Sequence, residues 1–339
     1  MTVDDSAALQ RGLDALAPSL IEGARSVTGL QRLSGGASQE TWSFALQFGS
    51  RPALPLVLRR ASQGSAQRAA GNASLAAEAQ IIALAAAAGV PVPRVYAVLS
   101  PAMGLGEGYV MQHVEGQTLG RKIVADPRLA QARAVLARQC GHALARIHAV
   151  DTAALPPLRR APMRDQLAYY EAQHRSHGTL KPVFELALQW LKLHAPGDAP
   201  RLSLVHGDFR NGNIVVDASG LRAVLDWEMA HLGDPMEDLG WLCVNSWRFG
   251  QVDLPVGGFG QREELFAGYR DGGGSVHAEH VHYWEVFGTL KWGVICESMA
   301  QSYLSGAERN VERAAIGRRA SEADIDLLCL LAPRQRQTA

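Results

Sequence analysis

The sequence predicts a two-lobed α+β protein in which a small lobe, built on an antiparallel sheet, precedes a larger and mostly helical lobe. Two observations support this prediction: short apolar runs divided by turn residues fill residues 29–60, and helical patterns dominate after residue 126. A length of 339 residues also favours two lobes over a single core. Because the chain changes character near residue 114, we place the lobes at 1–113 and 114–339.

The small lobe opens with three predicted strands, whose sequences are "LQRLSG", "ETWSFALQF" and "LPLVLRR". The turn residues between them are Gly35, Gly36, Gly49, Ser50 and Pro52. This order is typical of an antiparallel meander. A helix is predicted over 74–89, because "SLAAEAQIIALAAAAG" contains good helix formers and ends at Gly89. A fourth strand begins near Val95, and "GYVMQHVEGQTL" is a fifth strand that runs into a polar connector.

The large lobe is predicted to contain seven helices. Asp126 and Pro127 are suited to begin the first, which reaches about Ala149, because Asp is a favoured N-cap and Pro is tolerated in the first turn. The other helices are predicted near 163–177, 182–194, 237–245, 262–270, 278–304 and 322–331. Ser321 is the predicted N-cap of the last helix.

Composition and charge narrow the class of protein. Hydrophobic residues make up 47% of the chain, and 33 basic side chains balance 33 acidic ones, so the chain is globular and lacks the electrostatic signature of a nucleic-acid-binding protein. We expect no membrane partner, since the chain has no basic and apolar leader and no apolar run of about 18 residues. We expect a cytosolic protein with reduced core thiols at the four scattered cysteines, Cys140, Cys243, Cys296 and Cys329.

One short stretch, "LVHGDFRNGNIVVD" at 204–217, places polar side chains between two apolar runs that are predicted strands. Its spacing is H-x-D-x-x-x-x-N, formed by His206, Asp208 and Asn213, and the next apolar strand ends at Asp226 in "AVLDWE". Phosphoryl transfer from ATP needs a carboxylate that orients the attacking hydroxyl and oxygen ligands that hold Mg²⁺ on the phosphates. This set supplies both, whereas the alternative interpretation is an ordinary hairpin turn.

The small lobe contains a candidate partner for this motif. Arg59 ends the third strand and Glu78 lies in the helix that follows, an arrangement in which a strand cation holds the phosphates and a helix carboxylate holds the cation. The alternative is a solvated ion pair with no role in binding. No GxxxxGK[ST] sequence occurs in the chain, which excludes the other common ATP-binding motif.

The sequence resembles the aminoglycoside phosphotransferase and choline kinase family, which has a protein-kinase-like fold. The stretch "LVHGDFRNGNIVVD" matches the HGDxxxxN loop of that family, and "VLDWEMAHLGDPMEDLGWL" matches its metal-binding segment. The resemblance extends from "RLSGGASQETW" through "EAQIIALAAAAGVPVP" and "YVMQHVEG" to the helical end. The segments "VLRR", "VPVP" and "LDWEMAHLGDPMEDL" are most similar in sequence to those of kinase-like domains found alone in bacteria or fused to acyl-CoA dehydrogenases.

The resemblance implies a role for each site residue. Asp208 would be the catalytic base, Asn213 and Asp226 the Mg²⁺ ligands, and Glu78 the partner of Arg59, which holds the nucleotide phosphates. The adenine would bind the backbone of the segment that joins the lobes, at Gln112, His113 and Val114. The loop "SGGASQE" would cover the phosphates with main-chain N–H groups, and its residues include Gly35, Gly36 and Ser38.

Two features depart from the family pattern. The phosphate-binding cation is Arg59 where many relatives have Lys, and a guanidinium favours bidentate phosphate contacts. The covering loop lacks G-x-G-x-x-G, so the phosphates would be covered in a different way.

The neighbouring polar residues have weaker assignments. His206 is interpreted as a scaffold residue bonded to backbone near Asp226. Asp238 either caps a helix or, by resemblance, braces the catalytic loop. Asp234 is interpreted as a turn residue, and Glu228 could reach the metal or the substrate. Arg210 and Asn211 face either phosphate or solvent.

Together these features predict a Mg²⁺-dependent kinase that transfers the γ-phosphoryl group of ATP to a hydroxyl of a small molecule. The first alternative is a nucleotide-binding pseudokinase or regulatory module. The second is a hydrolase that uses His206 and Asp208 with a Ser or Cys, which no GxSxG motif supports. Cationic acceptors such as aminoglycosides or choline would need an acidic pocket, whereas the acyl-CoA dehydrogenase association suggests hydroxylated acyl compounds. Four tryptophans either form an acceptor wall or belong to the core: Trp241, Trp247, Trp284 and Trp292.

Overall fold

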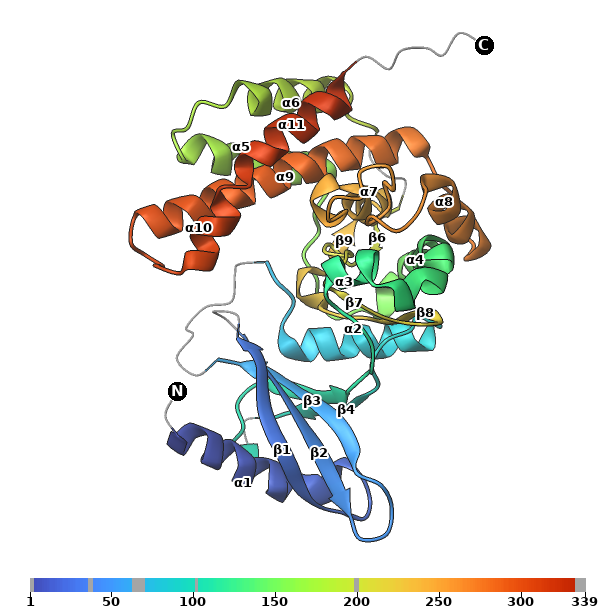
Figure 1. Ribbon diagram of the computed structural model, residues 1–339, viewed down its shortest axis with the longest axis vertical. Coiled ribbons are helices and arrows are strands. Elements are labelled where there is room, and N and C mark those ends of the chain that lie inside the picture. Colours follow the sequence, from blue (N-terminus) through green and yellow to red (C-terminus); the bar gives the residue numbers. More distant parts are fainter. Residues whose placement is uncertain (1–2, 36–38, 63–70, 101–102, 198–200, 333–339) are drawn as a thin grey trace.

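The computed structural model describes residues 3–35, 39–62, 71–100, 103–197 and 201–332. A sheet-containing lobe lies at one end of the molecule and a helical lobe at the other (Figure 1). The elements of the first part of the chain are α1 (Val3–Leu20), β1 (Ala24–Gly35), β2 (Gln39–Phe48), β3 (Leu54–Ala61), α2 (Leu75–Ala87), β4 (Val95–Leu99) and β5 (Gly108–Gln112). The α+β class predicted from the sequence is confirmed, while the lobe boundary after residue 113 stays a prediction.

The five strands form one antiparallel sheet in the order β1-β2-β3-β5-β4. Buried and partly exposed side chains alternate along β2, with Trp42, Phe44 and Leu46 on its apolar face, as a half-buried strand requires. These side chains pack against Leu13 and Leu16 of α1, which covers the outer face of the sheet (Figure 1). Helix α1 was not predicted from the sequence, although its buried leucines have helical spacing.

Helix α2 connects the two lobes. Ser74 caps it by accepting a hydrogen bond from the N–H of Ala77, and Gly89, with φ of +81°, follows its C-terminal end. Although α2 lies in the first part of the sequence, its side chains Ile81 and Ile82 belong to the apolar core of the helical lobe. The helix therefore fixes the sheet lobe to the large lobe, and it carries the buried Glu78 to their junction.

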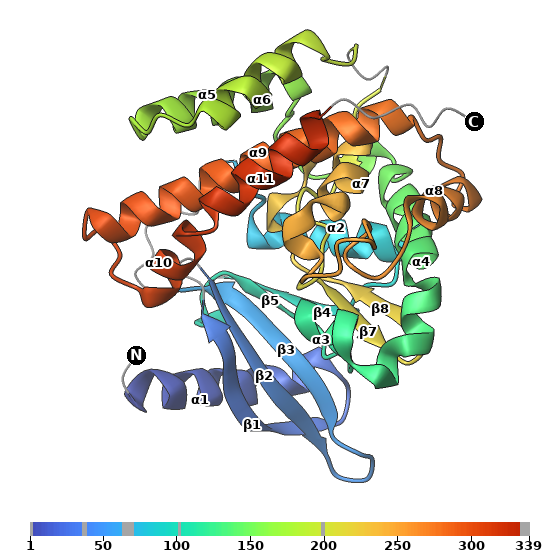
Figure 2. The ribbon, with the colours of Figure 1, turned by 45° about the horizontal axis from the view of Figure 1, so that its top comes forward.

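The large lobe is mostly helical. Its helices are α3 (Gly120–Ala125), α4 (Ala130–His148), α5 (Met163–Ser176), α6 (Pro182–Leu193), α7 (Met236–Cys243), α8 (Arg262–Asp271), α9 (Ala278–Leu304), α10 (Val311–Gly317) and α11 (Ala320–Leu331). Helix α9 is the longest of these, with 27 residues, and it packs against α5, α6, α7, α10 and α11. Figure 2 shows α5 and α6 on one side of α9 and α7 on the other.

Two local predictions for this lobe need correction, and two short helices were not predicted. Asp126 caps a short 3₁₀ turn at Pro127–Leu129, and α4 begins only at Ala130. Ser321 is not an N-cap, because α11 begins one residue earlier, after Arg319, and has no side-chain cap. Helices α3 and α10 were not predicted, since each has fewer than eight residues and too little periodicity to recognise.

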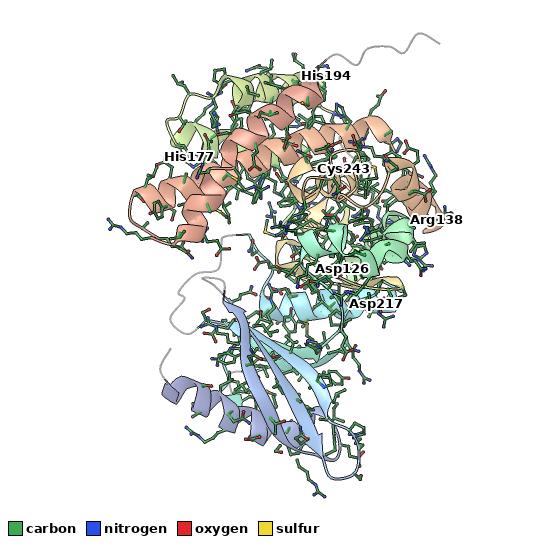
Figure 3. All side chains as sticks on the ribbon, in the orientation of Figure 1. Asp126, Arg138, His177, His194, Asp217 and Cys243 are labelled. Carbon is green, nitrogen blue, oxygen red and sulfur yellow. The ribbon has the colours of Figure 1, made fainter. Side chains whose placement is uncertain are left out.

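Three of the four cysteines are core thiols, as predicted. Cys243 lies inside the helical lobe (Figure 3), where burial raises the pKa of its thiol to about 12. Cys140 and Cys296 are also buried, but Cys329 is exposed. The prediction for Cys329 is wrong because α11 turns Ala323 and Leu327 inward, which leaves Cys329 on the outer face. Of the described helices, none combines the length and apolarity required to cross a bilayer.

Two small sheets inside the helical lobe hold the polar motif. One pairs β6 (Ser203–Val205) with β9 (His231–Gly233), and the other pairs β7 (Ile214–Asp217) with β8 (Gly220–Val224). The motif loop connects β6 to β7, and the segment with Asp226 connects β8 to β9. Both segments therefore connect the same two sheets, and this brings residues from the two motifs together.

The close packing of α4 against α8 gives a stability prediction. A Cβ at Gly268 of α8 would overlap the carbonyl oxygen of Arg138 in α4, and backbone cannot move away without shifting a helix. We expect Gly268→Ala to lower the free energy of unfolding by about 1–3 kcal/mol, because overpacking costs more than the gain in helix propensity. Urea unfolding of both proteins measures this. A Cβ at exposed Gly197 would meet nothing within 4 Å. Equal stabilities of Gly197→Ala and Gly268→Ala would contradict the prediction.

Candidate active site

A buried carboxylate, Asp238, holds the loop that carries Asp208. Asp238 of α7 accepts hydrogen bonds from the backbone N–H groups of His206 (2.8 Å) and Gly207 (2.9 Å) and from Nε2 of His148 (3.0 Å). Burial alone would raise the pKa of Asp238, but the hydrogen bond from His148 and the donors of the loop lower it below its usual range. Asp238 therefore braces the loop and does not cap α7, whose N-cap is Pro235.

His206 and Gly207 fix the start of the loop. The fully buried His206 donates from Nε2 to the carbonyl oxygen of Leu225 at 2.9 Å, immediately before Asp226, which is the scaffold role expected for it. Gly207 has φ of +80°, and a Cβ there would lie 2.6 Å from the carbonyl oxygen of Met229. Only glycine allows the loop to approach this second segment so closely.

Asp208 is oriented by three side chains. Its Oδ2 accepts a hydrogen bond from Nδ2 of Asn213 (2.5 Å), and its Oδ1 accepts one from Nε of Arg210 and one from Nε1 of Trp241, both at 2.9 Å. This role of Trp241 was not predicted from the sequence, where its position one helical turn after Asp238 was the signal for it. With three donors, the carboxylate is held in one orientation.

Asn211 has a structural role. It is fully buried, and its Nδ2 donates to the carbonyl oxygens of Trp247 (3.1 Å) and Gly257 (2.5 Å). The expectation that Asn211 faces phosphate or solvent is therefore wrong, because the loop turns this side chain into the protein. Arg210 instead faces Asp208 and lies over the ring of Trp247 at 4.6 Å.

Arg59 meets three carboxylates at the junction of the lobes. Its guanidinium lies 3.3 Å from Glu78, 2.6 Å from Asp226 and 3.6 Å from Glu228. Only 12% of the Arg59 side chain is exposed, and Glu78 is fully buried, so the alternative of a solvated pair does not describe this site. Burial would lower the pKa of Arg59, but Asp226 and the other acidic groups around it raise it well above its usual value. Arg59 therefore carries a permanent charge here.

Two further residues complete this cluster, and the sequence analysis missed both. Gln39 accepts a hydrogen bond from Nε of Arg59 and donates to Glu228 at 3.0 Å. Tyr109 donates from its hydroxyl to Glu78 at 3.1 Å. The strand register explains their positions, because Tyr109 lies directly opposite Arg59 across β3 and β5, and Gln39 is a diagonal neighbour on β2. Only the strand register places these two residues beside Arg59, and local sequence patterns do not reveal the register.

Asp226 has an unusual backbone conformation, with φ of 64° and ψ of 70°. A left-handed conformation of a residue other than glycine costs about 1–3 kcal/mol and is concentrated at functional sites. It ends β8 abruptly and begins a 3₁₀ turn at Trp227–Met229, which directs the Asp226 carboxylate toward Arg59. The N–H of Leu225 donates to the carbonyl oxygen of Asn213 at 2.8 Å, so the two predicted metal ligands are held on adjoining backbones.

A cavity of about 530 Å³ between the lobes brings the predicted nucleotide and metal residues together. Arg59, Asn213 and Asp226 all line it. Its apolar walls include Ile82, Tyr109, Met111, Leu119, Val224 and Trp227. We call it the interlobe cavity. The cavity thus combines charged and amide groups in one region with apolar walls in another, and a nucleotide requires both.

The donor set fits Mg²⁺. Asn213 and Asp226 supply hard oxygen ligands, and no donor among the described residues contacts Oδ1 of Asn213. In the described part of the chain no group of three or more His, Cys, Asp or Glu side chains could hold a metal by itself. A site with one carboxylate and one amide is typical of Mg²⁺ that is bound together with substrate phosphates.

The structure does not bring every predicted site residue to this cavity. Gln112, His113 and Val114 do not line it, and the N–H groups of Gln112 and His113 donate to Arg94 and Pro55. Met111 is the lining residue nearest to that segment. Gly35 ends β1, opposite Glu40, while the predicted loop residues Gly36 and Ser38 lie outside the described residues.

The four tryptophans divide between the core and the site. Trp284 belongs to the core of the large lobe and donates to Asp234, whose other oxygen accepts from the N–H of Met236 in the expected turn. Trp241, Trp247 and Trp292 form a separate aromatic cluster. This cluster lies directly behind Asp208, because Trp241 donates to it.

Comparisons with known proteins agree with the fold and the motifs. The family model for the phosphotransferase enzyme family matches residues 29–273, and the chain belongs to this family. It is 33% identical over 201 residues to acyl-CoA dehydrogenase family member 10 of Mus musculus, covering 56% of this chain and 18% of that protein. It is 29% identical over 245 residues to acyl-CoA dehydrogenase family member 11 of Gallus gallus, covering 70% of this chain and 30% of that protein. The matches thus span less than a third of these relatives.

Solved structures show the same fold. A Ralstonia eutropha protein provisionally described as an aminoglycoside phosphotransferase aligns with a TM-score of 0.71 and 22% identity, over 94% of this chain and 97% of that one. A thermostable mutant of an aminoglycoside phosphotransferase, crystallised with AMP-PNP and hygromycin B, aligns with a TM-score of 0.59 and 18% identity, over 93% and 97%. The protein-kinase-like fold and the family that the sequence predicted are confirmed.

Proposed function

We propose that the protein is a Mg²⁺-dependent small-molecule kinase that transfers the γ-phosphoryl group of ATP to a hydroxyl. The observation that carries this proposal is the convergence of Arg59, Asn213 and Asp226 on the interlobe cavity, with Asp208 bonded directly to Asn213. Membership of the phosphotransferase enzyme family supports it. So does a structural neighbour that holds a nucleotide analogue in a complex with its antibiotic. We place this activity in the cytosol, in agreement with the three buried free thiols.

The charges of the site residues indicate how the phosphoryl donor, ATP, would bind. Arg59 would bind the nucleotide phosphates through its forked N–H donors, and Glu78 and Gln39 would hold its guanidinium in place. Asn213 and Asp226 would hold Mg²⁺, which supplies positive charge against the triphosphate when it is bound. The apolar wall with Ile82 and Met111 would contact the base.

Asp208 acts on the acceptor in this proposal. The acceptor oxygen forms a bond to the γ-phosphorus while the bond from that phosphorus to the β,γ-bridging oxygen breaks, so ADP leaves. The hydroxyl proton passes to the carboxylate of Asp208, which the amide of Asn213 and the indole of Trp241 keep in position. Catalysis would then consist of positioning and electrostatic stabilisation.

The hydrolase alternative is disfavoured by the geometry of His206. Its Nε2 is bonded to the carbonyl oxygen of Leu225, and its Nδ1 lies 3.3 Å from the N–H of Asp208, so both ring nitrogens contact backbone. A general base needs a free nitrogen within reach of a nucleophile. The measurement of turnover described next distinguishes a kinase from a pseudokinase.

Replacing Asp226 tests the proposed function. We expect Asp226→Ala to abolish phosphorylation of the acceptors that the wild-type protein phosphorylates, because one of the two metal ligands is lost. The measurement is transfer of radioactive phosphate from γ-labelled ATP, with Mg²⁺, to a panel of hydroxylated small molecules. The control is Asp253→Ala, which changes an exposed carboxylate outside the interlobe cavity and should retain activity. Wild-type turnover by Asp226→Ala would overturn the metal assignment, and a wild-type protein that binds Mg·ATP without turnover would be a pseudokinase.

A further inference from the structure

A second cavity lies next to the catalytic loop, and the kinase mechanism above does not yet use it. Its volume is about 410 Å³, and its lining includes Tyr170 of α5, Asn72 before α2 and Met229. Met229 ends the same 3₁₀ turn that begins with Trp227 of the interlobe cavity, and its carbonyl oxygen lies against Gly207. The two cavities thus flank one turn. We call the second one the acceptor cavity, since its lining residue Met229 contacts the loop that carries Asp208.

A buried ammonium group lies behind this cavity. Only 5% of the Lys291 side chain is exposed, and its Nζ lies 4.7 Å over the ring of Trp241 and 5.9 Å over the ring of Tyr170. Trp241 donates to Asp208, while Tyr170 lines the acceptor cavity. Lys291 is therefore placed between the catalytic base and the cavity wall.

The hydrogen-bonding capacity of Lys291 is unused within the described residues. Its nearest carboxylate oxygen, on Glu237, is 3.9 Å away, which is too long for a hydrogen bond. Glu237 accepts from Gln166 (2.7 Å) and His231 (3.1 Å) at Oε2, whereas its Oε1, the oxygen that forms the long ion pair with Lys291, has no hydrogen-bond partner among the described residues. Burial would lower the pKa of Lys291, but Tyr170, Glu237 and Asp208 raise it above its usual value, so the ammonium is charged. Glu237 thus compensates the charge of Lys291 but does not satisfy its donors, and a buried ammonium without an acceptor in hydrogen-bond distance is costly unless a ligand supplies one.

Two guanidinium groups extend this positive charge along the cavity. Arg159 and Arg160 both line it, and within the described residues no carboxylate lies within 4.0 Å of either. One carboxylate, Asp165, also belongs to the lining. The charge of Arg159 acts on Lys291, since it opposes the rise in the pKa of that ammonium. The cations therefore outnumber the acids on this side of the site.

We propose that the acceptor carries an anionic group, a carboxylate or a phosphate ester, which binds between Lys291 and Arg159 while its hydroxyl faces Asp208. This inference rests on the proposed kinase function and specifies the chemistry of its acceptor. The ammonium would donate to the anion from inside the lobe and Arg159 from the cavity side. A cationic acceptor in the same place would meet Lys291, Arg159 and Arg160 without compensation.

The first experiment measures acceptor preference. Straight-chain hydroxycarboxylates, hydroxyalkyl phosphates and amino alcohols of equal length are compared as acceptors of labelled phosphate from ATP. We expect the anionic acceptors to be phosphorylated in preference to the amino alcohols, and the two anionic series distinguish a carboxylate from a phosphate. For Lys291→Met we expect KM for the anionic acceptor to rise about 10- to 100-fold, as the loss of a charged hydrogen bond predicts, with a smaller change in kcat. Lys291→Arg should recover much of the affinity.

The second experiment measures binding without turnover. Butyrate, butyl phosphate and butylammonium are titrated by saturation-transfer NMR into the wild-type protein, Lys291→Met and the matched control Lys192→Met. Lys192 is a surface lysine paired with Glu171, so its replacement should leave anion binding unchanged. Circular dichroism melting and Mg·ATP affinity check that Lys291→Met is folded.

The outcomes separate this inference from the proposed function. Anion binding that is lost in Lys291→Met but kept in Lys192→Met supports the anion site, even if no acceptor in the panel is phosphorylated and the kinase proposal fails. Equal anion binding by wild type and Lys291→Met, or a preference for amino alcohols, would overturn the anion site while leaving the kinase function standing. In that case Lys291 serves as the buried partner of Glu237 alone.

Discussion

Replacing Asp208 by Asn is expected to lower kcat for phosphoryl transfer about 10²- to 10⁴-fold, the range for loss of a positioned general base. Asparagine keeps the shape of the side chain and can still accept from Trp241 and Arg210, but its amide nitrogen cannot accept from Asn213 and it cannot take the hydroxyl proton. Because Asp208 does not line the interlobe cavity and touches the metal site only through Asn213, affinity for Mg·ATP should change much less than kcat. Single-turnover transfer of labelled phosphate and titration with a fluorescent nucleotide measure the two quantities separately.

The matched control for this variant is Asp217→Asn. Asp217 ends β7, eight or more residues from each site carboxylate in the sequence, and it contacts Ser219 and Arg222 at the edge of the lobe (Figure 3). Its replacement should leave kcat unchanged. An Asp208→Asn protein with wild-type kcat would show that the base lies elsewhere, and a parallel loss of nucleotide affinity would show that Asp208 binds the donor.

Replacing Asp238 by Ala is expected to lower the free energy of unfolding at pH 7 by about 3–5 kcal/mol, as the loss of one partner from a buried charged network predicts. The fully buried carboxylate accepts from two loop N–H groups and from His148, and alanine would leave these donors without an acceptor. Activity should fall as well, because the same N–H groups begin the loop that carries Asp208. Urea unfolding followed by circular dichroism measures the stability.

The pH dependence of this difference tests its cause. The pKa of Asp238 is lowered in the folded protein, so its contribution to stability is complete above its unfolded pKa of about 3.9 and is lost as the pH falls through the folded value. The gap between wild type and Asp238→Ala should therefore be full at pH 7 and shrink below about pH 4. A gap that stays constant down to low pH would argue for loss of packing instead. Asp253→Ala should show no gap at any pH.

Much of the site follows from local sequence. The order of the strands and of α2, the H-x-D-x-x-x-x-N spacing and the acid after the next strand are properties of short segments. Short segments reveal them because strand alternation, helix formers and turn residues act over a few residues. For the same reason the scaffold role of His206 was predictable, since Asp208 follows it by only two residues.

Other parts of the site depend on contacts between distant segments. Arg59 and Asp226 are 167 residues apart in the sequence, and Trp241 reaches Asp208 only because α7 packs beneath the loop. The bracing role of Asp238 could be proposed only by resemblance, because a carboxylate near a helix start is more often a cap. Helix α1 was not predicted, because its apolar face can be recognised as a buried face only when the sheet that it covers is known.

The sequence by itself determined the family and the α+β architecture with two lobes, and it named the acid and amide groups that we propose for phosphoryl transfer. Only the tertiary structure decided which groups meet: Arg59 with three carboxylates, Asp208 with Trp241, and Lys291 behind a cavity lined with arginines. The physical reason is the distance along the chain over which each effect acts. Propensity and spacing act between neighbours in the chain, whereas strand register and helix packing bring together side chains that no local pattern connects.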